Sequence, residues 1–137
     1  GAGPRRLAIQ ADGTLWIPLF GSGELVKFDS VKGVELARYG IPDAGAAPYG
    51  VTLDKKRNAI WAATTNSDRI YRFDIATEQW SHYPMPRKET YIRMIEIDPL
   101  TGDIWTTYSS LPVGKRDPQL YGTPSANNII VRLRPGD

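Results

Sequence analysis

Short runs of apolar and β-branched residues alternate with polar turns along the chain. The turns are rich in Gly, Asn and Asp, as at Asp12-Gly13 and at residues 98–103. No segment shows the 3.6-residue apolar period of an amphipathic helix. Runs of this kind, separated by turn residues, are typical of strands. The pattern therefore predicts an all-β protein.

The apolar runs recur with a fixed period. Trp16, Trp61 and Trp105 lie 45 and 44 residues apart, and Pro4 and Pro48 are separated by 44 residues. Such self-similarity indicates a repeat architecture. Aligned on these anchors, the chain divides into three copies that cover residues 4–47, 48–90 and 91–137.

Each copy carries the same order of strands. The first strand is expected at residues 5–9, 49–53 and 93–97. The second is expected at residues 15–17, 60–62 and 104–106, and the third at 25–28, 70–73 and 130–133. A fourth strand follows at residues 36–39 and 80–83 in the first two copies, whereas the third copy has none.

A four-stranded unit that recurs every 40–45 residues is typical of a β-propeller blade. The sequence therefore predicts three four-stranded antiparallel blades, the last lacking its outer strand, as half or a fragment of a six- or seven-bladed propeller. The alternative is a β-sandwich with accidental internal similarity. Sandwiches rarely repeat a Trp, an aromatic residue and a Pro in register, so the propeller is favoured.

The residues that recur in every copy are interpreted as core. The three tryptophans recur, and so does the series Phe28, Phe73 and Leu133. A catalytic residue would occur once, whereas residues that pack one blade on the next occur in each blade. We therefore expect consecutive blades to bury Trp16, Trp61, Phe28 and Phe73.

Three blades do not close a ring, because closed propellers have about 4–8 blades. Either the remainder of a longer chain completes the ring, or copies associate. Two copies would give a six-bladed ring with two-fold symmetry, and self-association of this kind is the partner that the sequence predicts. The third copy is expected to leave a free sheet edge, guarded by the charges of Arg132 and Arg134.

Composition and net charge argue against some classes of partner. The hydrophobic, aromatic and charged fractions of 41%, 10% and 23% are those of an ordinary folded, soluble protein. A net charge of +2 without any basic run argues against nucleic acid, and no apolar run reaches the ~20 residues that span a bilayer. The first residues lack a signal-peptide pattern, and the absence of Cys fits either the cytoplasm or an exported location.

One end of the blades is expected to carry the ligand site. The start of the first strand and the loop after the second open on the same face of a propeller. They place Arg5, Arg6, Tyr49, Arg93 and Asn66 there. Arginine forks suit an anionic or carbonyl-bearing small ligand. In the alternative, the arginines form a solvated rim paired with acids such as Asp43, Asp68 and Asp117.

The third copy carries a long insertion on the same face. Trp105 and Ile130 are 25 residues apart, against 9 for the corresponding pairs in the first two copies. The extra residues fall within 109–128, and Arg116 among them is a predicted ligand contact. Long loops on a rigid scaffold are often functional. The alternative is a merely decorative loop.

Glu96 is the one acidic residue within a first strand, where its counterparts are Ala8 and Thr52. An unrepeated carboxylate near the axis of a propeller is a candidate general base or metal ligand, and Glu96 is the predicted catalytic residue. The alternative is a buried acid that is satisfied by Arg93, three residues earlier.

The second copy resembles one blade of the virginiamycin B lyase (streptogramin lyase) family. The resemblance rests on residues 48–53, 59–61, 66–74 and 83–86, which read PYGVTL, AIW, NSDRIYRFD and YPMP. It extends over the chain and is weaker in the third copy, where Ile92 replaces the leading Pro. Related propellers of the NHL and gluconolactonase type share parts of this pattern.

The resemblance implies a metal-assisted C–O lyase that opens a cyclic depsipeptide such as streptogramin B, with magnesium as the cofactor. Lyases of this family are thought to use a histidine and acidic residues near the channel. His82 is the single histidine here, and we expect it to be exposed on an outermost strand. No residue matches the family positions by motif, so none is transferred and the metal ligands stay unknown. The alternative function is a non-catalytic module that binds a small ligand or peptide.

Overall fold

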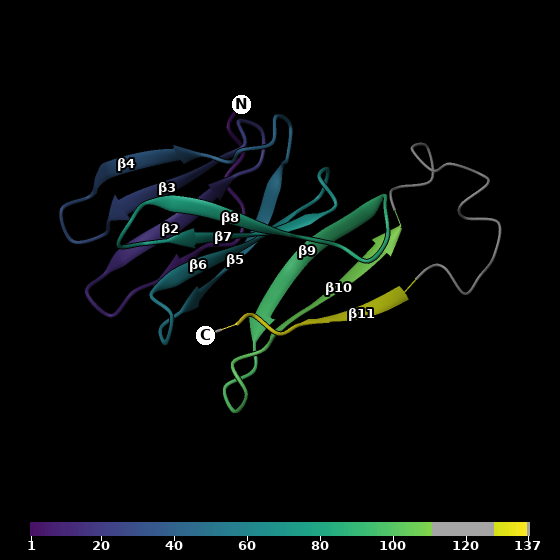
Figure 1. Cartoon of the computed structure of the whole chain (residues 1–137). Coiled ribbons are helices and arrows are strands. Elements are labelled where there is room, and N and C mark those ends of the chain that lie inside the picture. The colour runs from purple at the N-terminus through teal and green to yellow at the C-terminus, as the bar shows by residue number, and fades with distance from the viewer. Residues whose placement is uncertain (111–127, 137) are drawn as a thin grey trace.

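The computed structural model describes residues 1–110 and 128–136, which form eleven strands and no helix (Figure 1). The strands are β1 (Ala8–Ile9), β2 (Thr14–Leu19), β3 (Glu24–Asp29), β4 (Val34–Gly40), β5 (Pro48–Asp54), β6 (Ala59–Thr64), β7 (Arg69–Asp74), β8 (Gln79–Pro84), β9 (Thr90–Ile97), β10 (Ile104–Ser110) and β11 (Asn128–Leu133). Within these ranges no helix is long and apolar enough to cross a membrane.

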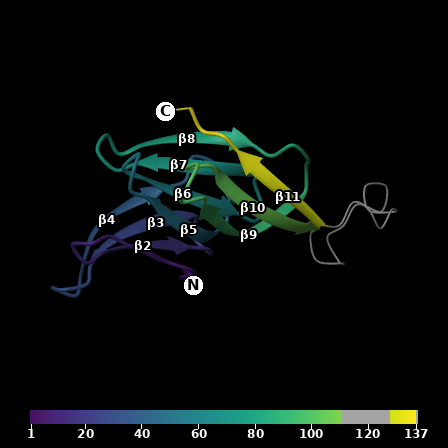
Figure 2. The ribbon, with the colours of Figure 1, turned by 90° about the horizontal axis from the view of Figure 1, so that it is seen from below.

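The strands form three antiparallel sheets, here called blades. Blade 1 has the order β1-β2-β3-β4, blade 2 the order β5-β6-β7-β8, and blade 3 the order β9-β10-β11. Figures 1 and 2 show the three sheets side by side, with blade 2 between the other two. The all-β class is confirmed, and in the described residues blade 3 has three strands where the other two blades have four.

The first strands of successive blades lie close together. The Arg6 N–H donates to the Tyr49 carbonyl oxygen at 3.1 Å, which joins blade 1 to blade 2. A Cβ atom on Gly50 would lie 2.6 Å from the carbonyl oxygen of Arg93. Glycine is thus needed at this position because β5 and β9 approach too closely for a side chain.

Two apolar cores form, one at each junction between blades. Trp16 projects from blade 1 into the first core, and Trp61 projects from blade 2 into the second. Both side chains are fully buried, and both indole N–H groups are satisfied. Trp16 donates to the Gln10 side chain at 2.9 Å, and Trp61 donates to the Asp54 carboxylate at 3.0 Å. The sequence prediction for these tryptophans is confirmed.

Two other expected core residues are more exposed than predicted. Phe73 is fully buried, but Phe28 is partly exposed because it lies on the face of blade 1 that points away from blade 2. Trp105 is also partly exposed. Each blade turns its tryptophan toward the next blade, and in the described part of the chain nothing stacks on blade 3. The interpretation of every repeated aromatic as core was therefore wrong for Phe28 and Trp105.

Candidate functional site

Irregular pairing at the start of the first strands determines where three predicted site residues lie. In β5 the register shifts between Pro48 and Gly50, so Tyr49 is left out of the ladder. In β9 the shift leaves Arg93 out in the same way. Arg5 occupies the equivalent place in blade 1, next to the isolated bridge at Pro4. Such bulges redirect a side chain out of its sheet, and here they bring these positions to the inner ends of the blades.

Arg5 packs against two aromatic rings. Its guanidinium lies 4.7 Å from the centroid of the Phe20 ring and 5.6 Å from that of Tyr49. The two rings are nearly perpendicular, with centroids 6.0 Å apart. Cation–π contacts of this kind fix the direction of the guanidinium while leaving its N–H groups available at the surface.

A hollow of about 410 Å³ lies beside these positions. It combines guanidinium and phenol groups with an apolar wall and is lined by Arg6, Tyr91, Arg93, Met94, Thr107, Tyr108, Ile129 and Ile130. Arg6 comes from the segment before β1, and the other residues come from β9, β10 and β11. The Arg93 guanidinium lies 5.6 Å from the centroid of the Tyr91 ring. Concave sites with an apolar wall and few polar groups are typical ligand sites.

Tyr108 lines this hollow and also belongs to the core between blades 2 and 3. Its side chain is buried, and among the described residues its hydroxyl has no hydrogen-bond partner. Burial raises the pKa of the Tyr108 phenol, against the opposing effect of the Arg87 charge and with a contribution from Asp68. The phenol therefore stays protonated and can donate a hydrogen bond. A buried polar group without a partner is rare, which favours a ligand there.

The predicted acidic partners of the rim arginines are engaged elsewhere. Asp43 accepts hydrogen bonds from Tyr71 and Arg69. The Tyr71 hydroxyl lowers the pKa of Asp43, against the effect of burial, and Arg69 lowers it further. Asp68 accepts from the Thr90 amide at 2.6 Å and from its hydroxyl at 2.8 Å. Both acids thus have structural roles, and Asp117 lies outside the described residues.

Glu96 does not line the hollow. It is exposed on β9 and lies directly opposite Trp105 in the ladder with β10. The alternative of a buried acid is wrong for this residue, because its side chain is exposed.

The other predicted positions also lie apart from the hollow. Asn66 is exposed, and its backbone N–H donates to the Ala46 carbonyl oxygen at 3.3 Å. Arg116 lies outside the described residues. His82 is exposed on β8, as expected. Of the predicted ligand contacts, the structure brings Arg5, Tyr49, Asn66 and Arg93 to the same end of the blades.

Tyr91 and Tyr108 were missed from the sequence, although Tyr108 left a signal there. It pairs with Ile92 where Thr64 pairs with Pro48 and Leu19 with Pro4. An aromatic hydroxyl therefore breaks the repeat at that position. In residues 1–110 and 128–136, no group of three or more His, Asp or Glu side chains could hold a metal ion.

No family model matches the sequence, and no curated protein matches it. Solved structures do match. A catalytically inactive histidine-to-alanine virginiamycin B lyase from Staphylococcus aureus with quinupristin aligns with 95% of this chain at 22% identity and a TM-score of 0.70. A Kuenenia stuttgartiensis hydrazine synthase aligns with 83% at 14% identity and 0.66, and a luciferin-regenerating enzyme with 94% at 15% identity and 0.66.

These proteins carry different activities on related blades, so the likeness bears on the fold and not on the reaction. The chain spans 41% of the lyase, 34% of the hydrazine synthase and 44% of the luciferin-regenerating enzyme. The resemblance read from the sequence is confirmed at the level of architecture. This chain has the fold of β-propeller blades of the kind seen in virginiamycin B lyase.

Proposed function

We propose that this chain provides a ligand-binding rim in a lyase-like β-propeller, and that its ligand is a carbonyl-rich cyclic peptide of the streptogramin B class. One observation carries the proposal. The hollow combines the guanidinium groups of Arg6 and Arg93 with two tyrosines and an apolar wall, and the buried hydroxyl of one of them, Tyr108, has no hydrogen-bond partner among the described residues. The likeness to a virginiamycin B lyase crystallised with quinupristin supports the class of ligand.

The chemistry of the hollow fits such a ligand. The guanidinium groups of Arg6 and Arg93 present several N–H donors each, and the Tyr108 hydroxyl presents one more. A cyclic depsipeptide offers ester and amide carbonyl oxygens as acceptors. Met94 and Ile129 provide apolar contact for its side chains. A cyclic ligand also loses little conformational freedom on binding, which favours affinity.

Ring opening by elimination is the second candidate function, and the likeness to virginiamycin B lyase favours it. The reaction requires a base to accept a proton and a divalent cation to polarise the ester. The described lining of the hollow contains no Asp, Glu or His. Arg6, Arg93 and Tyr108 can bind and orient the ester carbonyl. Glu96 is the proposed base because it lies on the same face of β9 as Met94, which lines the hollow, and magnesium is the proposed cation.

Binding is tested by titrating quinupristin into the protein in a calorimeter. We expect Arg93→Ala to weaken binding at least about tenfold, because a hydrogen bond to a charged group contributes about 1.5–3 kcal/mol. Tyr108→Phe removes a neutral donor and should have a smaller effect. Arg38→Ala is the matched control, since Arg38 lies on β4 and pairs with Glu35. Equal affinities of the Arg93→Ala variant and the unchanged protein would contradict the proposal.

Catalysis is tested separately, by mass spectrometry of quinupristin incubated with the protein and magnesium. A linear product that depends on magnesium and disappears in Glu96→Gln would support the lyase reaction. Binding without any product would leave the ligand-binding function and exclude catalysis by the chain as tested.

A further inference from the structure

A second cavity lies at the end of the blades opposite the hollow. The hollow is lined by the beginnings of β9 and β11 and by the later part of β10. The second cavity, of about 410 Å³, is lined by the ends of β5 and β9 and by the turns that follow them. Figure 1 shows the turn between β9 and β10 as the lowest part of the ribbon. We call this cavity the turn groove.

The two turns that form the turn groove have the same backbone shape. Asp54 and Asp98 begin them, and each carboxylate accepts hydrogen bonds from amides of its own turn. Asn58 and Gly102 occupy equivalent places near the ends of the turns, with φ of 48° and 74°. Side-chain hydrogen bonds to the turn amides and a left-handed residue define a tight turn. The tips of both turns are therefore held in defined positions.

Arg57 ties the two turns together. Its Nη1 group donates to the Asp54 carboxylate and to the Gly102 carbonyl oxygen, both at 3.0 Å. The Arg57 side chain is only 9% exposed. A Cβ atom on Gly102 would lie 3.3 Å from Nη1, so the turn of blade 3 rests closely on the guanidinium. The walls of the turn groove are thus preorganised, which favours binding because little has to be ordered.

The tips of the two turns differ in chemistry. In equivalent places the turn of blade 2 has Lys55 and Lys56, whereas the turn of blade 3 has Pro99 and Leu100. All four residues are exposed, and Leu100 is 93% exposed. The turn groove therefore has a cationic wall on one side and an apolar wall on the other.

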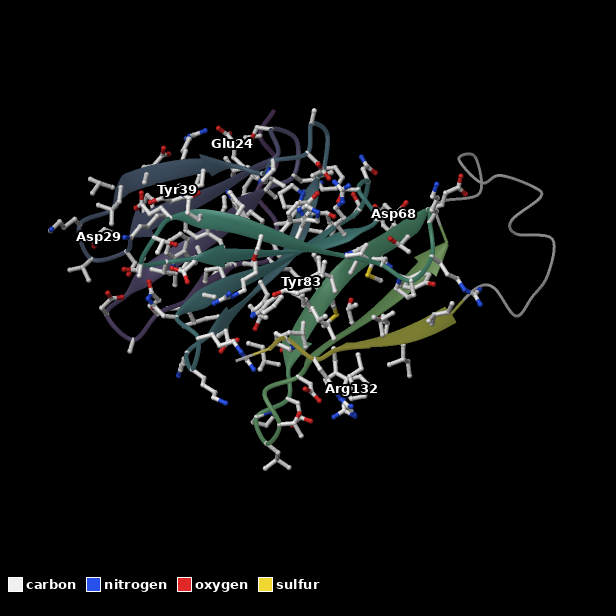
Figure 3. The ribbon with its side chains drawn as sticks, viewed as in Figure 1. Glu24, Asp29, Tyr39, Asp68, Tyr83 and Arg132 are labelled. Carbon is white, nitrogen blue, oxygen red and sulfur yellow. The ribbon has the colours of Figure 1, made fainter. Side chains whose placement is uncertain are left out.

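The carboxylates beside the turn groove are already engaged. Asp54 is paired with Arg57. Asp98 accepts from two amides of its own turn, which lower its pKa, and the charge of Arg132 lowers it further. Figure 3 shows Arg132 at this end of blade 3. By contrast, no acid of the described chain pairs with Lys55, so the charge that the turn groove offers to a ligand is positive.

We propose that the turn groove binds a small amphiphilic anion, an aliphatic carboxylate of medium chain length such as octanoate. Its carboxylate contacts the ammonium groups of Lys55 and Lys56. Its aliphatic chain packs on Ile97 and Leu100, which line the other side. The site lies apart from the hollow and does not depend on the function proposed above.

The size and order of the walls support this class of ligand. A volume of about 410 Å³ lies in the range of small-molecule sites. One cationic wall suits one charged group, and the apolar wall directly across from it suits a single chain. A surface of an anionic membrane is the competing occupant, because an exposed Leu100 beside lysines also suits a lipid headgroup layer. The test separates the two.

The test follows the backbone amide shifts of the full chain by nuclear magnetic resonance while sodium octanoate is added. We expect saturable shifts at residues 53–57 and 98–102. Burial of one CH₂ group tightens binding by up to about fourfold. Butanoate, which is four CH₂ groups shorter, should therefore bind at least about tenfold more weakly than octanoate.

Two variants examine the two walls. Leu100→Ser should weaken octanoate binding about fivefold, because part of the apolar contact is lost. The double change Lys55→Gln and Lys56→Gln should weaken it at least about threefold, as the loss of exposed ion pairs does. Val31→Ser and Lys32→Gln are the matched controls. Both lie on the turn between β3 and β4 and are exposed.

Figure 3 shows Asp29, where the control turn begins, on the other side of the view from Arg132. The control variants should therefore bind octanoate like the unchanged protein. Quinupristin binding at the hollow is measured in the same variants and should not change, so the failure of either proposal can be told from the failure of the other.

Shifts that spread evenly over the surface without saturation would overturn the proposal. Equal octanoate affinities of Leu100→Ser, the double lysine variant and the unchanged protein would do the same. The proposal would also be overturned if the chain bound mixed phosphatidylcholine and phosphatidylserine vesicles through Leu100 but did not respond to monomeric octanoate. That result would assign the two turns to a membrane surface.

Discussion

Trp61 and Trp105 occupy the same place in successive blades and have opposite surroundings. Trp61 is fully buried, donates to Asp54 and packs against Tyr83. Trp105 is partly exposed and has the Arg132 guanidinium over its ring. Their strands are alike, so the difference comes from what lies beyond the sheet. Burial here is a property of the junction between two blades and not of one blade.

The consequence is an uneven distribution of stability. Apolar burial contributes about 25 cal/mol per Å², so the two closed junctions supply much of the favourable free energy of the described fold. The outer face of blade 3 contributes less, because its apolar side chains stay in contact with water. Mutations at equivalent positions should therefore have unequal effects.

The largest difference is expected for the tryptophans themselves. Trp61→Ala should lower the free energy of unfolding by about 3–5 kcal/mol, as large-to-small changes of buried aromatic residues do. Trp105→Ala should cost about 1 kcal/mol, since part of the ring is already solvated. Urea unfolding followed by far-UV circular dichroism measures both. Equal losses would show that the outer face of blade 3 is as well covered as the junctions.

Asp54 offers the next test, at the junction between blades 2 and 3. Its carboxylate accepts from Trp61 at 3.0 Å and from Arg57 at 3.0 Å, and Arg57 also donates to the Gly102 carbonyl oxygen at 3.0 Å. Asp54→Asn leaves a buried guanidinium without its counterion and should cost about 3 kcal/mol. Asp98, the counterpart in blade 3, accepts from turn amides, and Asp98→Asn should cost less than about 1 kcal/mol.

The carboxylate of Asp54 also makes the free energy of unfolding depend on pH. Burial alone would raise the pKa of Asp54, but the hydrogen bonds from Trp61 and Arg57 outweigh it and hold the pKa below its usual value. A lowered folded-state pKa contributes stability that is present above about pH 4 and is lost as pH falls through the folded value. The unchanged protein should therefore lose more stability than Asp54→Asn between about pH 4 and pH 2. Parallel curves of unfolding free energy against pH would contradict this role.

The variant Gly50→Ala tests whether the first strands β5 and β9 must pack closely. The new Cβ would meet the backbone of Arg93, which cannot move aside without separating β5 from β9. We expect a loss of about 2 kcal/mol, in the range of overpacked sites. Gly40→Ala is the matched control, because Gly40 lies in β4 with nothing within 4 Å of its Cβ position. Similar midpoints of urea unfolding for the two variants would show that β5 and β9 can move apart to make room for a side chain.

Much of this architecture was predictable from the sequence because each blade repeats the same pattern of residues. The spacing of Trp16, Trp61 and Trp105 placed the blades. The environment of Trp105 was not predictable, since a period-two pattern shows which residues share a face but not what covers that face. Phe28 was misplaced for the same reason.

The site was predicted less completely. Tyr49 and Arg93 occupy equivalent positions in the repeat. The bulges that turn them out of the ladder could not be predicted, because no residue type in the sequence marks them. Tyr108 was not predicted as a site residue, because an aromatic residue in a strand is more often core, although a tyrosine replaces Thr64 and Leu19 there. Glu96 was expected near the axis because it breaks the repeat. The structure places it in the first strand of blade 3, as expected, on the face that also carries Trp105.

The smallest expected effect concerns a polar contact between blades 1 and 2. The Tyr39 hydroxyl donates to a Glu78 carboxylate oxygen at 2.6 Å. Burial, and then the Glu78 carboxylate, raise the pKa of Tyr39 to about 12. A raised folded-state pKa contributes stability that is present below about pH 10 and is lost as pH rises toward 12. The contact is exposed, so Tyr39→Phe should cost less than about 1 kcal/mol near neutral pH.

Ultraviolet titration of the phenols gives the sharper readout. Tyr39→Phe should remove a phenol that ionises near pH 12, and Glu78→Gln should bring that ionisation to lower pH because the neighbouring negative charge is gone. Tyr83→Phe is the matched change in blade 2, and it should leave the Tyr39 ionisation in place, since no described contact joins the two residues. If Glu78→Gln left the Tyr39 ionisation unchanged, the raised pKa would come from burial alone. The contact would then contribute nothing to the closed junction that distinguishes blades 1 and 2 from the outer face of blade 3.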